Sequence, residues 1–417
     1  MNENQNTTNI HPAGSVIRWI IFGILSGVII GAVGAFFGLA VIKATQFRES
    51  HAWIIYSLPL IGLIITTIYA KAGNNVHHGT DLVIEAIRNK EAMPPIMAPV
   101  IIVSTILTHL AGGSAGREGA ALQIGGSLGS TLAKPLKKVL HFTDKDHGRI
   151  VMCGMSAAFS SIFGTPLAAV IFPLELSTVG ILPYSALLPC TSSSLSAFMT
   201  AQWIGMPAER MPLSNVPVFS IQKAGPVMIL AILTALISIL FCQAIHVLDH
   251  YSRQYIKNEY TRTILAGVIL IALTLMTGTH EFNGTGANFI EEAVMDPAFK
   301  TNWYTFLLKI LFTAITISGS FKGGEIVPSF FIGAMFGRFY GPLLGIDPQF
   351  AAALGMGCMF CGITNCPLST LLIMFELFGF EGNMYFILAV AITYLFSGNH
   401  SIYHTQIIHH HKAGIEE

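Results

Sequence analysis

The sequence has few charged residues for its length. Only 11% of its 417 residues are Asp, Glu, Lys or Arg, whereas 53% are hydrophobic and the mean hydropathy is +0.63. A water-soluble domain cannot bury so large an apolar fraction, so this composition predicts a polytopic membrane protein. The 22 basic and 22 acidic residues cancel, and no nucleic-acid partner is therefore indicated.

The sequence is also poor in the groups that would form a metal or catalytic centre. It has no HExxH zinc motif, and we expect no enzymatic activity and no cofactor. Its six cysteines lie almost wholly in apolar segments, where a thiol ordinarily packs as a small hydrophobic group and not in a disulfide framework. Cys358, Cys361 and Cys366 have no fourth ligand near them in the sequence, so we predict no metal site.

The apolar segments differ in length. We expect a polar N-terminal tail at 1–14 without the basic region of a signal peptide, one transmembrane domain at 15–403, and a polar C-terminal tail at 404–417. The segment 16–42 can span a bilayer of about 30 Å, and its regularly spaced glycines predict close helix packing. The segment 96–109 is too short to span, and short segments joined by glycine-rich turns predict discontinuous helices.

Polar stretches separate these segments. We expect the stretches 134–149 and 280–300 to be loops. A short helix is predicted at 82–88, with Thr80 or Asp81 as its N-cap. Histidines lie in the connectors and the tail, and we interpret them as solvated residues, with metal binding or pH sensing as the alternative. These are His77, His78, His400, His404 and the run 409–411.

A glycine-rich stretch, 112–126, places the carboxylate of Glu118 and the neighbouring Arg117 between two apolar segments. The glycines allow the backbone to approach a ligand closely, and the composition of 119–133 predicts a helix that begins beside Glu118. Free N–H groups and the positive end of the helix dipole favour an anion at such a terminus. The stretch therefore predicts an anion site within the membrane, with a simple capped turn as the alternative.

The chain contains an internal repeat. Residues 165–176 and 366–377 both carry Pro-Leu, and a glutamate follows the proline after nine positions in each. We predict two homologous halves of inverted topology, at about 15–205 and 217–403, with a site between them. The two glutamates, Glu175 and Glu376, are interpreted as structural carboxylates that cap or pair with neighbouring segments.

Together these motifs resemble the CLC family of chloride channels and halide/proton antiporters, from about residue 16 to 403. The turn 116–119 is similar to the gating-glutamate motif of that family, the turn 324–328 to its second anion-binding turn, and Tyr403 falls where its central tyrosine lies. The resemblance implies an all-α fold of two inverted-topology repeats with tilted, partly discontinuous helices. It also implies a homodimer with one anion path in each subunit. We expect the segment after Tyr403 to be a polar tail and not a regulatory domain.

The resemblance implies that Glu118 is the gate and couples protons to the anion. When ionised it would occupy the place of the anion, and when protonated it would swing aside. The side chain of Arg117 is interpreted as a structural ion-pair partner, with direct anion binding as the alternative. The implied anion-binding positions are Gly79, Thr80, Gly116, Arg117, Gly119, Gly323, Gly324, Glu325, Ile326, Val327 and Tyr403.

The implied function is transport of chloride, fluoride or both across a bacterial inner membrane with counter-movement of protons. A passive anion channel of the same fold is the alternative. The turn 79–83 departs from the Gly-Ser-Gly-Ile-Pro sequence that is usual in the family. The sequence of residues 321–325 is similar to that of the bacterial fluoride-exporting branch, although that branch usually carries Met or Asn in place of Thr80. Because a threonine hydroxyl serves both halides, we expect measurable chloride transport with at most a modest fluoride preference.

Overall fold

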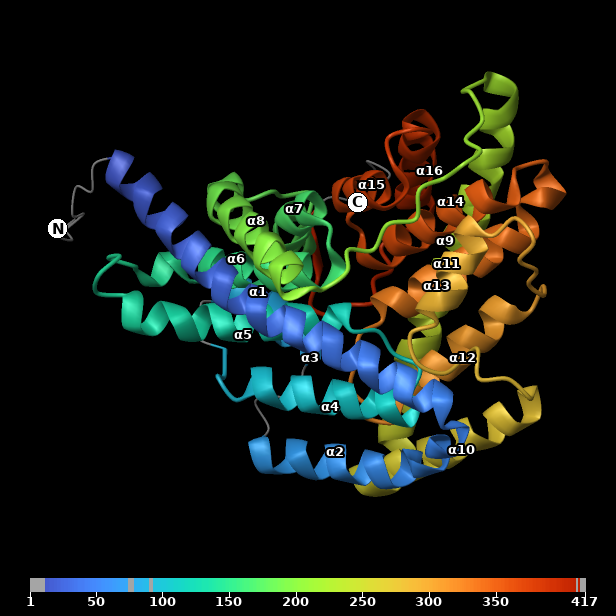
Figure 1. Ribbon diagram of the computed structural model, residues 1–417, viewed down its shortest axis with the longest axis horizontal. Coiled ribbons are helices and arrows are strands. Elements are labelled where there is room, and N and C mark those ends of the chain that lie inside the picture. Colours follow the sequence, from blue (N-terminus) through green and yellow to red (C-terminus); the bar gives the residue numbers. More distant parts are fainter. Residues whose placement is uncertain (1–11, 74–78, 90–92, 410–411, 413–417) are drawn as a thin grey trace.

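The computed structural model describes residues 12–73, 79–89, 93–409 and 412 (Figure 1). Most of the predicted N-terminal tail, together with His77, His78 and the histidines at 410–411, lies outside the described residues. The helices of the first half are α1 (Pro12–Ser50), α2 (Leu58–Ala72), α3 (Gly79–Asn89), α4 (Met97–Ala111), α5 (Glu118–Leu136), α6 (His147–Phe163), α7 (Pro166–Leu176) and α8 (Leu187–Ile204).

The second half continues with further helices, most of them shorter than 20 residues. They are α9 (Ile221–Tyr255), α10 (Glu259–Thr277), α11 (Ala287–Met295), α12 (Thr305–Ser318), α13 (Ile326–Tyr340), α14 (Pro348–Thr364), α15 (Pro367–Phe378) and α16 (Asn383–Phe396). In Figure 1 most first-half helices lie on one side and the orange and red helices of the second half on the other. The strands among the described residues form one two-residue parallel pair, β1 (Thr178–Val179) with β2 (Ile407–Ile408).

Long and short apolar helices occur together, as the segment lengths predict. Four described helical stretches are long and apolar enough to cross a membrane: Gly14–Ser50, Ala52–Ala72, Ile221–Tyr255 and Glu259–Thr277. Others are shorter: α4 has 15 residues, or roughly 22 Å at 1.5 Å per residue, and α7 has 11. The prediction of discontinuous helices is confirmed.

The glycine face of α1 packs against α8, as its spacing predicts. A Cβ atom at Gly31 would lie 2.7 Å from the Cα atom of Ala197, and Cβ atoms at Gly23 and Gly27 would collide with the serines of α8. Only hydrogen side chains allow this approach, which brings the two backbones into the close contact that stabilises helix pairs in lipid.

The repeated Pro-Leu…Glu segments cap each other. Glu175 at the end of α7 accepts hydrogen bonds from the N–H groups of Leu368 (3.0 Å) and Ser369 (2.9 Å), which open α15. Glu376 in α15 accepts bonds from the N–H groups of Leu167 and Ala168, which open α7, at 2.9 Å each. The structural interpretation of both carboxylates is confirmed, and this reciprocal capping relates the two halves.

Three local predictions were wrong. The stretch 280–300 contains α11, whose short apolar face (Ile290, Ala293, Val294) is buried. The helix predicted at 82–88 begins earlier, at Gly79, so Thr80 and Asp81 lie inside its first turn and do not precede it. The stretch 134–149 is not wholly a loop, because α5 runs to Leu136 and α6 begins at His147.

Candidate anion path

The two glycine-rich turns meet at the centre of the protein. The N–H group of Gly116 donates to the carbonyl oxygen of Gly324 at 2.6 Å, and the N–H group of Gly324 donates back to Gly116 at 2.7 Å. A Cβ atom at Gly324 would lie 2.5 Å from the backbone nitrogen of Gly119. Glycine is therefore required here by the approach of two backbones, and the helices α5 and α13 begin side by side.

Glu118 is the first residue of α5, and its side chain is 1% exposed. Its Oε2 atom accepts a hydrogen bond from the N–H group of Arg117 (3.0 Å), and its Oε1 atom accepts one from the Nε atom of Arg117 (3.3 Å). Arg117 also bonds Glu209 from its Nη2 atom at 2.6 Å. The interpretation of this arginine side chain as an ion-pair partner agrees with these contacts.

A cavity of about 330 Å³ lies next to the glycine bridge. Among the positions proposed for anion binding, those that line it are Gly79, Thr80, Gly323, Glu325 and Tyr403. A Cβ atom at Gly119 would lie 3.4 Å from the Oε2 atom of Glu325 and 3.7 Å from the Oγ1 atom of Thr80, whereas one at Gly116 would lie 3.0 Å from the Oε2 atom of Glu118. The turn 116–119 therefore has the carboxylate of Glu118 against one end and the cavity at the other.

Several polar atoms that border this cavity are buried without a hydrogen-bond partner in the part of the chain that the structure describes. They are the Tyr403 hydroxyl, the Oε2 atom of Glu325 and the Oε1 atom of Gln123. The hydroxyl of Thr80 has weak bonds only, accepting from Gln123 at 3.3 Å and donating to the carbonyl oxygen of Gly119 at 3.5 Å. Buried polar groups without partners carry a free-energy cost, and a bound ligand can remove it.

Comparison with known proteins decides the family. The family model described as voltage gated chloride channel matches residues 61–398. This chain belongs to that family. A chloride/fluoride channel protein of Pseudomonas syringae pv. tomato (strain ATCC BAA-871 / DC3000) is 32% identical over 404 residues, which cover 95% of this chain and 88% of the relative. An H(+)/Cl(-) exchange transporter, ClcA, of Vibrio parahaemolyticus serotype O3:K6 (strain RIMD 2210633) is 23% identical, with 90% and 85% covered.

Solved structures agree with this assignment. A crystal structure of a CLC-type fluoride/proton antiporter superposes with a TM-score of 0.89 at 30% identity, covering 94% of this chain and 98% of that one. A slow cyanobacterial Cl-/H+ antiporter gives a TM-score of 0.77 at 19% identity, covering 93% and 95%, and supports the fold alone. This voltage gated chloride channel family member therefore has the expected inverted-repeat membrane fold.

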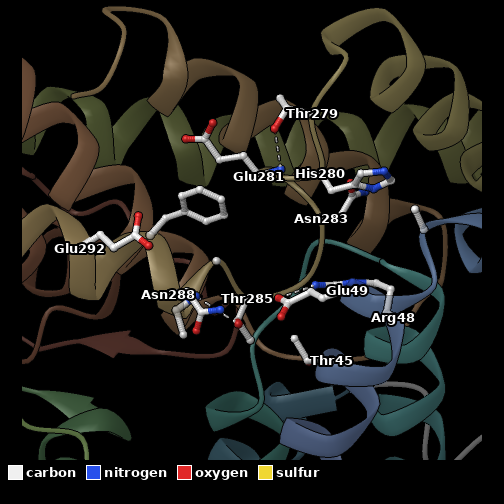
Figure 2. Close-up of a pocket in the computed structure, with 14 residues that line it drawn as sticks. Thr45, Arg48, Glu49, Thr279, His280, Glu281, Asn283, Thr285, Asn288 and Glu292 are labelled. Atoms are coloured by element: carbon white, nitrogen blue, oxygen red, sulfur yellow. Dashed lines mark hydrogen bonds and ion pairs between the residues drawn. The ribbon is translucent and has the colours of Figure 1, made fainter. Parts of the chain in front are cut away.

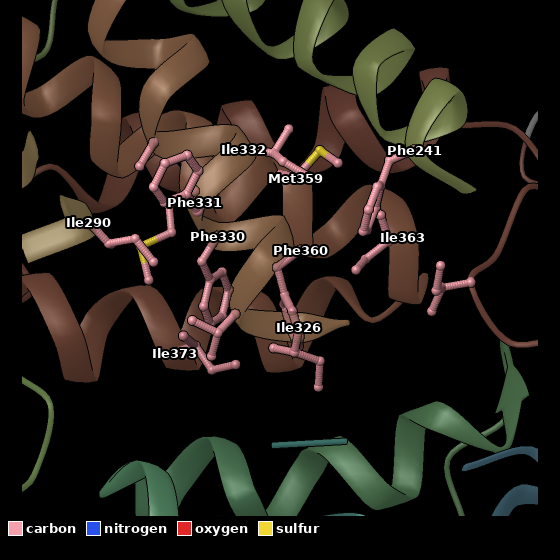
Figure 3. Close-up of a cluster of buried hydrophobic side chains, with 14 of the residues drawn as sticks. Phe241, Ile290, Ile326, Phe330, Phe331, Ile332, Met359, Phe360, Ile363 and Ile373 are labelled. Carbon is pink, nitrogen blue, oxygen red and sulfur yellow. The ribbon is translucent and has the colours of Figure 1, made fainter. Parts of the chain in front are cut away.

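The remaining proposed positions do not line the cavity. Ile326 and Val327 are buried in the largest apolar cluster, where Figure 3 shows Ile326 together with Phe330 and Phe360, so that only their backbone N–H groups could serve an anion. The N–H groups of Gly116 and Gly324 are already used, because each donates to the carbonyl oxygen of the other residue. The roles of all these positions in anion binding stay predictions.

Sequence reasoning missed three polar residues around the path. Gln123 lies one turn after Gly119, and its position as an amide within the apolar stretch 119–126 was a usable signal. Lys322 lines the cavity with its ammonium group 4.3 Å from the ring centroid of Tyr69. Glu209 lies between the two halves, and nothing in the surrounding sequence indicated that it would reach Arg117.

Two other features of this family member lie apart from the path. A cavity of about 290 Å³ lies between the end of α1, at Arg48 and Glu49, and the segment 279–292. Figure 2 shows its lining, which includes none of the predicted anion-path residues. Ser114 and Ser127 stand in a Gly-x-Ser-x-Gly spacing typical of hydrolases. Ser114 is bonded to the Thr313 hydroxyl at 3.0 Å, and Ser127 donates to a backbone carbonyl at 2.7 Å, so each hydroxyl has a structural partner.

Proposed function

We propose that this protein is a halide/proton antiporter in which fluoride is the preferred anion. The observation that carries the proposal is the position of Glu118, whose carboxylate lies where the two glycine turns meet and is held by the N–H and guanidinium groups of Arg117. The carboxylate group carries the same charge as a halide ion and binds the same kind of hydrogen-bond donor, so the two compete for these donors.

Proton coupling follows from this competition. Protonation removes the charge of Glu118 and weakens its bonds to Arg117, so the side chain can leave and an anion can take its place. When the proton is released, the carboxylate returns and displaces the anion. The guanidinium group of Arg117 stays paired with Glu209, and N–H groups at the helix N-terminus supply further donors that bind an anion without trapping it.

The cavity supports fluoride over chloride. Among the described residues, the atoms without a hydrogen-bond partner that border it include the Tyr403 hydroxyl and the Oε2 atom of Glu325. An anion beside Glu325 requires that carboxyl group to be protonated, since two adjacent negative charges repel, and the protonated group then donates a hydrogen bond. Fluoride, the smaller and more basic ion, gains more from short hydrogen bonds than chloride does. This proposal goes beyond the modest preference expected from Thr80 alone, and the relatives described as a chloride/fluoride channel protein and a fluoride/proton antiporter support it.

We also propose a homodimer in a bacterial inner membrane. Leu195, Met199 and Trp203 stand four residues apart on α8 and are 45, 70 and 87% exposed, which leaves an apolar stripe for lipid or a second copy. Disulfide crosslinking of cysteines placed along this stripe, in native membranes, is expected to give a covalent dimer. Crosslinking only at control positions on α10 would instead place the contact elsewhere.

The anion and the coupling are tested in one liposome experiment. Fluoride and chloride efflux are measured in parallel from vesicles that carry the purified protein, with and without an imposed proton gradient. We expect faster fluoride efflux and a reversal potential that shifts with the proton gradient. A reversal potential that does not change when a proton gradient is imposed would favour a passive channel. That is the function suggested by the name of the Pseudomonas relative. Equal fluoride and chloride rates would remove the proposed preference.

A further inference from the structure

Glu209 lies in the segment that joins the two halves, and backbone bonds fix this segment at the gate. The N–H group of Glu209 donates to the carbonyl oxygen of Phe163 at the end of α6 (3.4 Å), and the N–H group of Met211 donates to that of Leu377 in α15 (2.8 Å). A Cβ atom at Gly164 would lie 2.6 Å from the Cα atom of Ala208. The segment is therefore anchored to both halves.

One guanidinium group is shared between two carboxylates. The Nη2 atom of Arg117 bonds Glu209 at 2.6 Å, while its Nε atom bonds Glu118 at 3.3 Å. The exposed fraction of the side chain is 1% for Glu118, 9% for Arg117 and 27% for Glu209, so Glu209 is the most exposed of the three. The shorter bond goes to Glu209, and this leaves the gate carboxylate with the weaker one.

We infer that Glu209 is a positioning residue that shares the guanidinium group of Arg117 with the gate, weakens the bond of that group to Glu118, and thereby sets the proton concentration at which Glu118 opens. This inference rests on the proposed antiport function. When both carboxylates are ionised, the three side chains carry one net negative charge, and each carboxylate opposes the ionisation of the other. Glu209 thus weakens the closed, ionised state of the gate and allows it to take up a proton more readily.

Other charged or titratable residues lie near Arg117, Glu118 and Glu209. They are His109 and Arg210, together with Glu291 on α11. Glu291 is exposed, and no ion pair joins it to Arg117 among the described residues. Glu291 is therefore a matched control, since it is a nearby carboxylate whose removal changes the charge without freeing the guanidinium group.

The test compares the pH dependence of fluoride efflux and proton flux in liposomes for wild type, Glu209→Gln, Glu209→Asp and Glu291→Gln. Glutamine keeps a hydrogen-bond acceptor and removes the charge. We expect the pH midpoint of fluoride efflux to fall by about one unit in Glu209→Gln. The reason is that the charge of Glu209, which shares a guanidinium group with Glu118, opposes the ionisation of Glu118 by roughly that amount. Glu209→Asp and Glu291→Gln should stay near the wild-type midpoint, and all variants should keep the wild-type anion/proton ratio.

An unmoved midpoint in Glu209→Gln, or an equal shift in Glu291→Gln, would overturn the inference while leaving the antiport function intact. A wild type without any proton coupling would overturn both. If Glu209→Gln cannot be purified as a monodisperse protein, Glu209→Ser removes the same charge and carries the same expectation. Recovery of the wild-type midpoint in Glu209→Asp separates the charge effect from a general loosening of the segment.

Discussion

Replacing Tyr403 with phenylalanine should weaken halide binding without weakening the fold. The Tyr403 hydroxyl borders the cavity and has no hydrogen-bond partner among the residues that the structure describes. A hydrogen bond to a charged ligand contributes about 1.5–3 kcal/mol, so its loss should reduce affinity roughly ten- to hundredfold. In the absence of halide the variant loses no bond within the protein, and its stability should be unchanged or slightly higher.

Tyr385 provides the matched control. Its hydroxyl accepts a bond from the N–H group of Ser220 (3.0 Å) and donates to the carbonyl oxygen of Val218 (3.1 Å), so its role is structural. Calorimetry should show a lowered fluoride affinity for Tyr403→Phe only, and thermal unfolding should show a lowered stability for Tyr385→Phe only. Unchanged affinity in Tyr403→Phe would place this hydroxyl outside the anion path and refute the reasoning.

Three further predictions concern the same elements. Gly324→Ala should abolish transport and destabilise the protein by about 1–3 kcal/mol, because its Cβ atom would lie 2.5 Å from the nitrogen of Gly119; liposome flux and thermal unfolding measure the two effects. Glu175→Ala should lower the unfolding temperature more than Glu376→Ala, since the first carboxylate is the more buried and accepts three bonds against two. Thr80→Ala should weaken calorimetric halide binding less than Tyr403→Phe does, because the Thr80 hydroxyl already has protein partners.

The position of Glu118 at the start of a helix could be predicted from sequence because its determinants are local. Glycines around Glu118 and an apolar segment after it specify a helix that begins at a charged residue, and the structure begins α5 at that residue. The Pro-Leu…Glu repeat likewise fixed Glu175 and Glu376 at equivalent positions, and both were correctly interpreted as structural. Local spacing was sufficient in these cases because the interactions involve helix termini, which the sequence marks directly.

Other parts of the site depend on contacts between distant segments. Glu209 contacts Arg117 although the two residues are 92 positions apart in the sequence. Glu209 is placed there by the close backbone approach of Ala208 to Gly164, which the sequence does not indicate. Glu325 was assigned to an anion-binding turn, but the sequence did not indicate that its Oε2 atom would be buried beside the cavity without a partner among the described residues. Helix α11 was missed because it has only nine residues and lies within a stretch that is otherwise polar.

The central claim is that Glu118 couples proton movement to halide movement. Simultaneous recording of proton and fluoride flux in liposomes, for wild type and Glu118→Gln, tests it most directly. Glutamine resembles the protonated gate, so the variant should retain fluoride flux and lose the coupled proton flux. Proton flux that persists in Glu118→Gln at the wild-type ratio to fluoride would show that Glu118 is not the coupling residue and would contradict this account.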